Sequence, residues 1–477
     1  GSVIAIAVLA CQSNAISVPS PQVLSTQTGL FEYEYLTPTA TSELEGIALQ
    51  PNFLADPNTA CAFHHQLISN SYPSVFALSC LDSNGWHVYG PDAFEDPLDV
   101  PWWIAQCPDG RIYLNMGSKP YVLEDGTLVE IGDALHQIIF LACGAGHEIW
   151  AGLLDGVGHY DGIAWTDYPA TEYLGSGENV RSRKGIAIAP NGNVWVATSD
   201  SIATFDGTNW QVFEAGKGFE ENPNPRGLAV DANGNVWVVN IHGLMKYDGV
   251  QWSTFYEGAP KYWPSYIAND EENRVWVAAA DPTGMVFSTI YTFDPQTNSW
   301  ALQFDHKVLS GTVINAMQFD RQGRLWVATN YGLDIYDGSV WTAYHTYTAD
   351  LYANSADAIF VLGNGPQLPA LAPKAPGSIH GKLANTDPAT YTNMQVEICL
   401  ESVKATYFGD TPCADQAYHV LTTVDTDGNF VFTDIPVGKY FLMIQKDEDT
   451  WSNAGIGEFE VNPGALTEFG EIVLPPN

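Results

Sequence analysis

A short motif recurs along the chain and limits the folds open to it. A glycine or polar residue, a second polar residue and an aliphatic residue come before an aromatic anchor. Clear copies occupy 192–197, 234–239, 273–278 and 323–328, and looser copies occupy 110–113 and 147–152. The anchors are Phe63, Tyr113, Trp150, Trp195, Trp237, Trp276 and Trp326. A period of about 40 residues is typical of repeat folds in which each repeat is one supersecondary unit.

The residues around each anchor predict four short antiparallel strands per repeat, which we name A to D in chain order. A small apolar strand such as 185–188 or 227–230 comes first, and an Asn-Gly or Asp-Gly pair joins it to the anchor strand. These pairs accept the positive φ of two-residue hairpins. An aromatic-Asp-Gly turn and a tryptophan follow, as in 160–165 and 247–252. A four-stranded repeat of this length predicts a β-propeller blade.

Seven anchors predict an all-β, seven-bladed propeller over residues 23–365. Segments 31–35 and 358–361 also read as strands, and they either close the ring together or form part of an eighth blade. The repeat resembles the two-component-regulator propeller repeat, with its Gly-x-Leu-Trp-Val-x-Thr and Tyr-Asp-Gly-x-x-Trp elements. It is also similar to the seven-bladed propellers of the virginiamycin B lyase type. The His, Glu and metal constellation of that lyase family has no matching positions here, so the resemblance implies the fold alone.

A second module is predicted after a Pro-rich linker at 366–377. Residues 378–477 alternate apolar and polar residues in short runs, as half-buried strands do. The run 426–440 resembles the carboxypeptidase regulatory-like (prealbumin-like) family, which implies an Ig-like β-sandwich used as a spacer or adhesive unit. Asp425 and Asp427 are calcium candidates, but a hairpin turn explains the Asp-Gly pair more simply, so no metal site is predicted.

Residues 1–22 are predicted to be an apolar segment and a tether. The run 3–10 before Cys11 resembles the end of a bacterial lipoprotein signal peptide, which implies that Cys11 is lipidated. Two other readings remain open. The segment is a remnant of preparation, or it is an assembly segment that docks on a neighbouring copy of the chain.

Six further cysteines form three candidate pairs. Cys61 and Cys80 lie on neighbouring strands of one predicted blade, Cys107 and Cys143 lie at similar places in successive repeats, and Cys399 and Cys413 share the C-terminal module. Three disulfides and one odd cysteine suit an oxidising compartment. Six buried thiols are the alternative.

Charge and composition exclude several functions. Lys and Arg number 18 and Asp and Glu number 55, which gives a formal charge of −37. Such a charge repels phosphates, so nucleic acids and anionic membrane surfaces are not expected as partners. No apolar run reaches the ~18–20 residues of a membrane-spanning helix. A membrane contact is expected only through a lipid on Cys11.

The predicted ligand site is the rim of the propeller channel, on the face that carries the long D–A connections. Residues immediately before each strand A are expected there: Glu45, Trp102, Ile138, Lys184, Arg226, Ser265, Asn315 and Asp357. The cations, carboxylates and aromatic ring among them suit a polar ligand. Alternatively, they solvate the ends of loops.

No catalytic residue set and no cofactor are predicted. His242 is the best single candidate for a base, but the histidines do not recur in register, and no nucleophile motif or phosphate loop occurs in a suitable context. We therefore expect an exported, non-enzymatic bacterial surface or extracellular protein with an interaction or structural role, which assembles into filaments through its N-terminal segment. Its expected partners are copies of itself or other surface proteins. The alternatives are a lipid-anchored receptor for a polar ligand and a propeller lyase or hydrolase.

Overall fold

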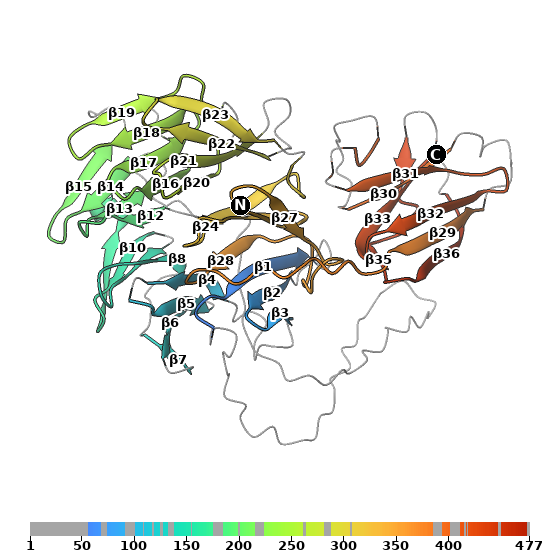
Figure 1. Cartoon of the computed structure of the whole chain (residues 1–477), viewed down its shortest axis with the longest axis horizontal. Helices are drawn as coiled ribbons and strands as arrows, with labels where there is room; N and C mark the ends of the chain where they lie inside the picture. Colours follow the sequence, from blue (N-terminus) through green and yellow to red (C-terminus); the bar gives the residue numbers. More distant parts are fainter. Residues whose placement is uncertain are drawn as a thin grey trace, which may run out of the picture.

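In the computed structural model, β-strands are the main regular element of the described residues (Figure 1). Within the described residues, the single helix is α1 (Ala170–Tyr173), which follows the outer strand of one blade. The structure describes residues 56–67, 74–90, 101–107, 109–116, 119–124, 127–131, 138–153, 155–174, 185–198, 201–214, 224–260, 264–280, 288–305, 308–384, 394–400, 411–414, 416, 418–446 and 450–474.

Within the described residues, seven four-stranded antiparallel sheets form propeller blades, and we number these blades in chain order. Blade 1 contains β28 (Ala358–Val361), β1 (Ala60–Leu67), β2 (Ser74–Asp82) and β3 (Gly85–Tyr89). Blade 2 contains β4 (Pro101–Gln106), β5 (Ile112–Met116), β6 (Lys119–Glu124) and β7 (Thr127–Glu130). Blade 3 contains β8 (Ile138–Cys143), β9 (Ile149–Leu153), β10 (Gly156–Tyr160) and β11 (Trp165–Pro169).

The other four blades repeat this order along the chain. Blade 4 contains β12 (Ile186–Ile188), β13 (Val194–Ala197), β14 (Ser201–Phe205) and β15 (Trp210–Glu214). Blade 5 contains β16 (Gly227–Val230), β17 (Val236–Asn240), β18 (Gly243–Tyr247) and β19 (Trp252–Phe255). Blade 6 contains β20 (Tyr266–Asn269), β21 (Val275–Ala280), β22 (Ser288–Asp294) and β23 (Ser299–Phe304), and blade 7 contains β24 (Ile314–Phe319), β25 (Leu325–Thr329), β26 (Gly332–Tyr336) and β27 (Trp341–Tyr344).

Segment 358–361 closes the ring. As β28, it supplies the innermost strand of blade 1 and pairs with β1 in the register Ala60↔Val361 to Phe63↔Ala358. Phe360 meets Trp103 of blade 2, with ring centroids 5.6 Å apart, so blade 1 packs against its neighbour on that side. The first blade is thus assembled from both ends of the propeller sequence. The other candidate strand, 31–35, lies outside the described residues, so an eighth blade remains untested.

The A–B turns differ from the predicted two-residue hairpins. In blade 5, the N–H of Gly234 donates to the carbonyl of Asp231, and the N–H of Asp231 donates to the carbonyl of Asn235. This pattern is a three-residue loop in which only the last residue, Gly234 with φ +81°, needs a positive φ. Asn273 takes that position in blade 6, with φ +62°. The C–D turn of blade 6 is a longer loop that begins at Asp294 and ends at Ser299. In blades 3, 4, 5 and 7 the C–D turns are two-residue loops, such as Asp206 to Asn209, with Gly207 at φ +93°.

The anchors fill the spaces between blades. Trp150 of blade 3 packs against Phe205 of blade 4 at 5.6 Å, within a cluster that also holds Ile186 and Val196 of blade 4. Trp237 and Trp326 are completely buried. The inner strands carry small or short apolar residues where the ring is narrowest, as in the Gly-Leu-Ala-Val of β16. A blade is wedge-shaped, so large rings fill the wide space between neighbouring sheets and small residues fit the narrow space near the axis.

The C-terminal strands form two sheets around one hydrophobic core (Figure 1). One sheet has the order β32 (Asn429–Ile435), β29 (Gly377–Leu383) and β36 (Leu466–Ile472). The other has the order β31 (His419–Thr423), β30 (Gln395–Cys399), β33 (Gly438–Gln445) and β34 (Trp451–Ser452), with β35 (Phe459–Val461) paired to β33. Asp425 accepts two N–H groups of its turn, from Asp427 and Asn429, as the hairpin interpretation predicts.

The two ends of the ring differ. The A–B and C–D turns lie on one side, which we call the turn face, and the B–C turns and D–A connections lie on the other, the loop face. Strand β28 runs from the loop face to the turn face, where the carbonyl of Asn364 accepts a hydrogen bond from Gln322 of the A–B turn of blade 7. The Pro-rich segment then returns along blade 7, and its Lys374 N–H donates to the carbonyl of Tyr347 on the loop face.

This return brings the C-terminal sheets against the loop face of blade 7. Tyr331, in the B–C turn, stacks on Tyr418 with ring centroids 6.1 Å apart and planes 14° apart. The hydroxyl of Thr346 donates to the carbonyl of Val437 at 3.1 Å. The Pro-rich segment is therefore a strap with hydrogen bonds along blade 7, and it ends beside the C-terminal sheets, where the N–H of Gly464 donates to the carbonyl of Ala375.

Substitution of Gly332 tests the B–C turn that carries Tyr331. Gly332 has φ +149°, and a Cβ atom there would lie 2.5 Å from the carbonyl oxygen of Tyr344 and 2.7 Å from Nδ1 of His345. We expect Gly332→Ala to lower the free energy of unfolding by about 2 to 4 kcal/mol. Gly207→Ala is the control, since φ is also positive there but no atom lies within 4 Å. Equal losses for the two variants in urea unfolding would contradict this account.

Candidate functional site

The two faces of the ring use their polar residues differently. On the turn face, Asp161, Asp206, Asp248 and Asp337 each accept two backbone N–H groups of their C–D turn. These bonds lower the pKa of each carboxyl. The recurring acidic residues of the turn face therefore form hydrogen bonds within their own hairpins.

Backbone hydrogen bonds place three predicted rim residues at equivalent positions on the loop face. The N–H of Arg226 donates to the carbonyl of Val239 at 2.8 Å, and the N–H of Ser265 donates to the carbonyl of Ala278 at 2.8 Å. In blade 1, the N–H of Asp357 donates to the carbonyl of Phe63 at 2.8 Å. Each residue thus comes directly before strand A of its blade, as the sequence predicts.

Asn315 and Asp357 come together on neighbouring blades. The side-chain amide of Asn315, in β24, donates to the carbonyl of Ala356 at 3.0 Å, and Ala356 is next to Asp357. Arg226, Asn315 and Asp357 are all half-buried, and Ser265 is exposed. This part of the rim offers a guanidinium, an amide, a hydroxyl and a carboxylate, which are groups that bind polar ligands through hydrogen bonds.

The other predicted rim residues add less. Ile138 begins β8 but is completely buried, so it contributes packing and no rim surface. Trp102 is the second residue of β4 and not the residue before the strand, and its side chain is outside the described residues. Glu45, Lys184 and the lipidation candidate Cys11 lie outside the described residues altogether. Their roles stay predictions.

His242 lies on the loop face, in the B–C turn of blade 5. Its ring is exposed and packs beside Tyr256 at 5.6 Å, and its N–H donates to the Asn240 side chain. Among the described residues, no carboxylate or nucleophile is recorded in contact with this ring. A general base needs such geometry, so the described surroundings give His242 a place in a turn and no catalytic partner.

Two buried polar groups near the loop face were not predicted. His64, in β1, contacts the carbonyl of Ser355 through Nδ1 at 2.7 Å and the Ser79 hydroxyl through Nε2 at 2.8 Å. Burial lowers its pKa to about 4. Asp334, in β26, accepts the N–H and the hydroxyl of Ser310, both at 2.9 Å, and burial raises its pKa to about 7. Neither belongs to a repeated motif, so the sequence carries no signal for them.

A third unpredicted feature has a clear sequence signal. Asp231, Asp270 and Asp320 each lie six residues before a tryptophan anchor and accept its indole N–H at 2.9, 2.7 and 2.8 Å. The same carboxylates accept N–H groups of the A–B turn. We call this arrangement the Asp–Trp clamp. Ala189 occupies the equivalent position in blade 4, where the same backbone turn forms without a carboxylate.

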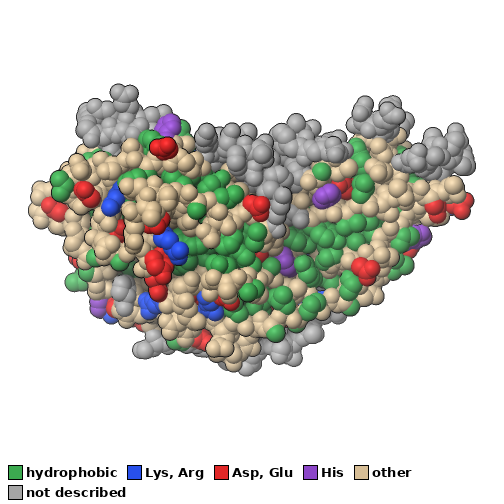
Figure 2. All heavy atoms as spheres, turned by 45° about the horizontal axis from the view of Figure 1, so that its top comes forward, with side chains coloured by type: hydrophobic (Ala, Val, Ile, Leu, Met, Phe, Trp, Pro, Cys, Tyr) green, Lys and Arg blue, Asp and Glu red, His purple; other side chains and the backbone are tan. Residues whose placement is uncertain are grey.

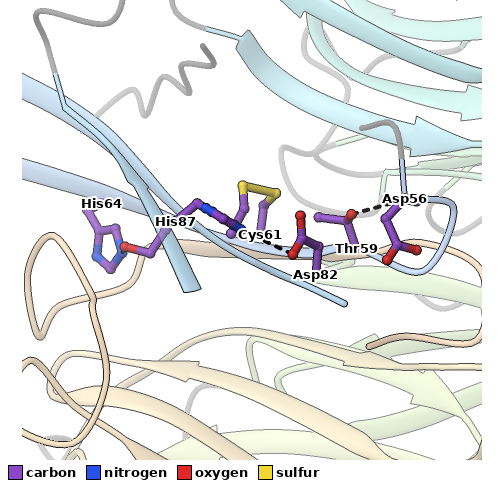
Figure 3. The surroundings of a disulfide bond; sticks show 8 residues. Asp56, Thr59, Cys61, His64, Asp82 and His87 are labelled. Carbon is purple, nitrogen blue, oxygen red and sulfur yellow. Dashed lines mark hydrogen bonds and ion pairs between the residues drawn. A yellow bond between two sulfur atoms is a disulfide. The ribbon is translucent and has the colours of Figure 1, made fainter. Parts of the chain in front are cut away.

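All three candidate disulfides are present. Cys61–Cys80 joins β1 and β2 at directly opposed positions, near the ion pair of His87 and Asp82 (Figure 3). Cys107–Cys143 links blades 2 and 3, and Cys399–Cys413 lies in the C-terminal sheets. Three disulfides in one chain are typical of exported proteins.

On the face drawn in Figure 2, Lys and Arg side chains lie among acidic and apolar ones without forming a continuous basic tract. No helix in the described part of the chain is long and apolar enough to cross a membrane.

Comparisons with known proteins agree with the repeat. The family model described as "Two component regulator propeller" matches residues 308–331, which include β24 and β25. No curated protein matches the sequence significantly. The match covers the first two strands of one blade, so it supports blades of this kind without assigning an activity.

Several solved structures are similar to this chain at low identity, with TM-scores below 0.5. Virginiamycin B lyase from Staphylococcus aureus is 12% identical, with 60% of this chain and 88% of that chain covered and a TM-score of 0.43. The extracellular domain of a hybrid two-component system from Bacteroides thetaiotaomicron is 13% identical, with 86% and 68% covered and a TM-score of 0.42. At 12 to 13% sequence identity, neither the activity of the lyase nor the signalling role of the two-component system transfers to this chain.

Proposed function

We propose that this chain is an exported, non-enzymatic interaction protein that binds a polar ligand or partner at the channel rim of its loop face. The observation that carries the proposal is the equivalent placement of Arg226, Ser265 and Asp357 by the same backbone hydrogen bond in three blades. At this end of the ring, the backbone position is therefore the same in the three blades, whereas the side chain that it carries differs from blade to blade. Function on propellers is expected on such variable positions of a rigid scaffold.

Two further observations support this proposal. The disulfides suit an oxidising compartment outside the cytoplasm. The recurring carboxylates of the turn face are engaged by their own hairpins, so we place the ligand on the loop face. Self-assembly through residues 1–10 and anchoring through Cys11 are separate predictions, and both concern residues outside the described part.

The rim is tested with the variant Arg226→Gln/Asp357→Asn. Wild type and variant are screened by thermal unfolding against neutral sugars, sugar acids, amino acids and short peptides. We expect one of these classes to stabilise the wild type, by about 2.7 kcal/mol at 100 times its Kd, and the double variant to lose most of this gain. Asp161→Asn, on the turn face, is the control that should keep it.

Two results would contradict the proposal. A ligand that stabilises both proteins equally would place binding elsewhere on the chain. If chromatography shows that the wild type converts a bound compound into a product, the protein is an enzyme. That result would overturn the proposal that it has no catalytic activity.

A further inference from the structure

The outer face of the sheet formed by β30 and β31 carries a buried polar cluster. Along β30, Val396 and Ile398 enter the hydrophobic core, so Glu397 and Cys399 point to the opposite side of the sheet. His419 is the direct cross-strand partner of Cys399. An outward face of a sheet is usually solvated, yet Glu397 and Cys399 have no exposed surface.

The segment around Cys413 covers this face. Glu397 accepts the hydroxyl of Thr411 at 2.6 Å and the N–H of Cys413 at 3.2 Å, and it lies 2.7 Å from Nδ1 of His419. Cys413 is also completely buried and is bonded to Cys399. The His419 side chain is 35% exposed, so the cluster reaches solvent on that side.

These side chains are the donors that a soft divalent cation needs. One oxygen of Glu397 and the two cysteine sulfurs lie within 4.8 Å of one another, and they form the single such group among the described residues. Tetrahedral zinc sites use two to four thiolates completed by imidazole or carboxylate ligands. Cys399, Cys413 and Glu397 supply two sulfurs and one oxygen at this spacing, and His419 adds a nitrogen 2.7 Å from Glu397.

The disulfide decides whether the sulfurs are ligands. In the oxidised chain, each sulfur is bonded to the other, and neither is a thiolate. A dithiol reductant transfers two electrons and two protons, so the Cys399–Cys413 bond breaks, two thiols form, and the reductant becomes a cyclic disulfide. Binding of Zn²⁺ then releases the two thiol protons, because thiolates are the ligands.

We propose that Glu397, Cys399, Cys413 and His419 form a redox-gated zinc site, closed by the disulfide and opened by its reduction. The carboxylate beside the two sulfurs favours the cation, since the site holds three negative charges when the thiolates form. The hydrogen bond between Nδ1 of His419 and Glu397 orients the imidazole before any metal arrives. This inference is independent of the function proposed for the propeller rim.

The same sheets contain a matched control. His380 and Glu468 form an imidazole–carboxylate pair at 2.6 Å on the parallel strands β29 and β36. A zinc site that needed only such a pair would form there too. If zinc binding needs the two cysteines, His380→Ala should not change it, whereas a site that needs only an imidazole–carboxylate pair would lose zinc in this variant.

The experiment measures zinc retained by the full chain after treatment with a dithiol, removal of the reductant without air and dialysis against zinc. Wild type is compared with Cys399→Ser/Cys413→Ser, which retains the other cysteines, so any zinc that those cysteines bind is the same in both proteins. We expect one additional zinc per reduced wild-type chain and none in the oxidised chain. His419→Ala should weaken binding about tenfold or more, and His380→Ala should leave it unchanged.

Cobalt(II) provides a readout that does not depend on stability. The reduced wild type and His380→Ala should show thiolate-to-cobalt absorption, and Cys399→Ser/Cys413→Ser should lack the increment. Equal zinc and equal absorption in reduced wild type and the double serine variant would overturn the proposal. So would unchanged affinity in His419→Ala, a half-exposed position at which the fold is expected to persist.

Discussion

Asp320→Ala is expected to lower the free energy of unfolding by about 3 to 5 kcal/mol. The Asp320 carboxylate has no exposed surface, and it accepts Nε of Arg324 at 2.6 Å and the indole N–H of Trp326 at 2.8 Å. Its removal leaves a guanidinium that is 11% exposed and an indole N–H without their acceptor. Buried groups that lose a charged partner account for a loss of this size.

Asp270→Ala in blade 6 is the matched control. It removes the same contacts, to Arg274 at 2.6 Å and to Trp276 at 2.7 Å, but the Arg274 side chain is 46% exposed. Water replaces the lost partner there, so we expect a smaller loss of about 1 to 3 kcal/mol. The measurement is urea unfolding of both variants by tryptophan fluorescence. Equal losses would show that burial of the arginine does not set the energy of the Asp–Trp clamp.

Ala189 makes the comparison sharper. It stands at the clamp position of blade 4, where the turn forms by backbone hydrogen bonds alone. The expected loss in Asp320→Ala therefore arises from the stranded side chains, and not from loss of the turn. Asp320→Ala/Arg324→Leu, which removes the guanidinium as well, should recover part of the stability.

The second large effect is on pH dependence, and it comes from Asp334. Its pKa is about 7 in the folded chain because burial disfavours the carboxylate, against a value of 3.8 when exposed. Between these two values, unfolding releases a proton, so the stability that the neutral acid contributes is complete below pH 3.8 and is lost as pH rises through 7. Each pKa unit corresponds to 1.36 kcal/mol, so the full loss is about 4 kcal/mol.

Asp334→Asn isolates this contribution. The amide resembles the neutral acid and still accepts the Ser310 N–H, so the variant should gain on the wild type as pH rises from 4 to 7 and level off above. His64 acts in the opposite direction, because its pKa falls from 6.5 to about 4 on folding, and acid then favours the unfolded chain. It is present in both proteins and cancels in the difference. A stability difference that stays flat across this pH range would refute the assignment of pKa 7 to Asp334.

The repeat predicts much of the propeller because each blade is a local structure. Four strands, their turns and the packing of Trp237 or Trp326 follow from patterns within about 40 residues. The cysteine pairs also follow, since Cys61 and Cys80 lie on adjacent strands and Cys107 and Cys143 repeat at similar places. The turn type of the A–B hairpins did not follow, because Asn-Gly occurs in both two- and three-residue loops.

The candidate site follows only in part. The positions before each strand A are predictable from the repeat, and Arg226, Ser265 and Asp357 occupy them. Ile138 shows the limit, since it lies twelve residues before its anchor, against eleven for Arg226, and is buried at a register shift between β8 and β9. Repeat position predicts where a backbone lies, whereas exposure depends on the side chains of the adjoining blades.

The sequence by itself determined the blade, the strand order within it and the cysteine pairs, because all of these depend on hydrophobic period, turn residues and short-range spacing. Only the tertiary structure decided that residues 358–361 complete blade 1, that the Pro-rich strap holds the C-terminal sheets against blade 7, and that Asp334 and Glu397 are buried. These features join segments far apart in the chain. Their energies come from packing and desolvation, which local residue patterns do not encode.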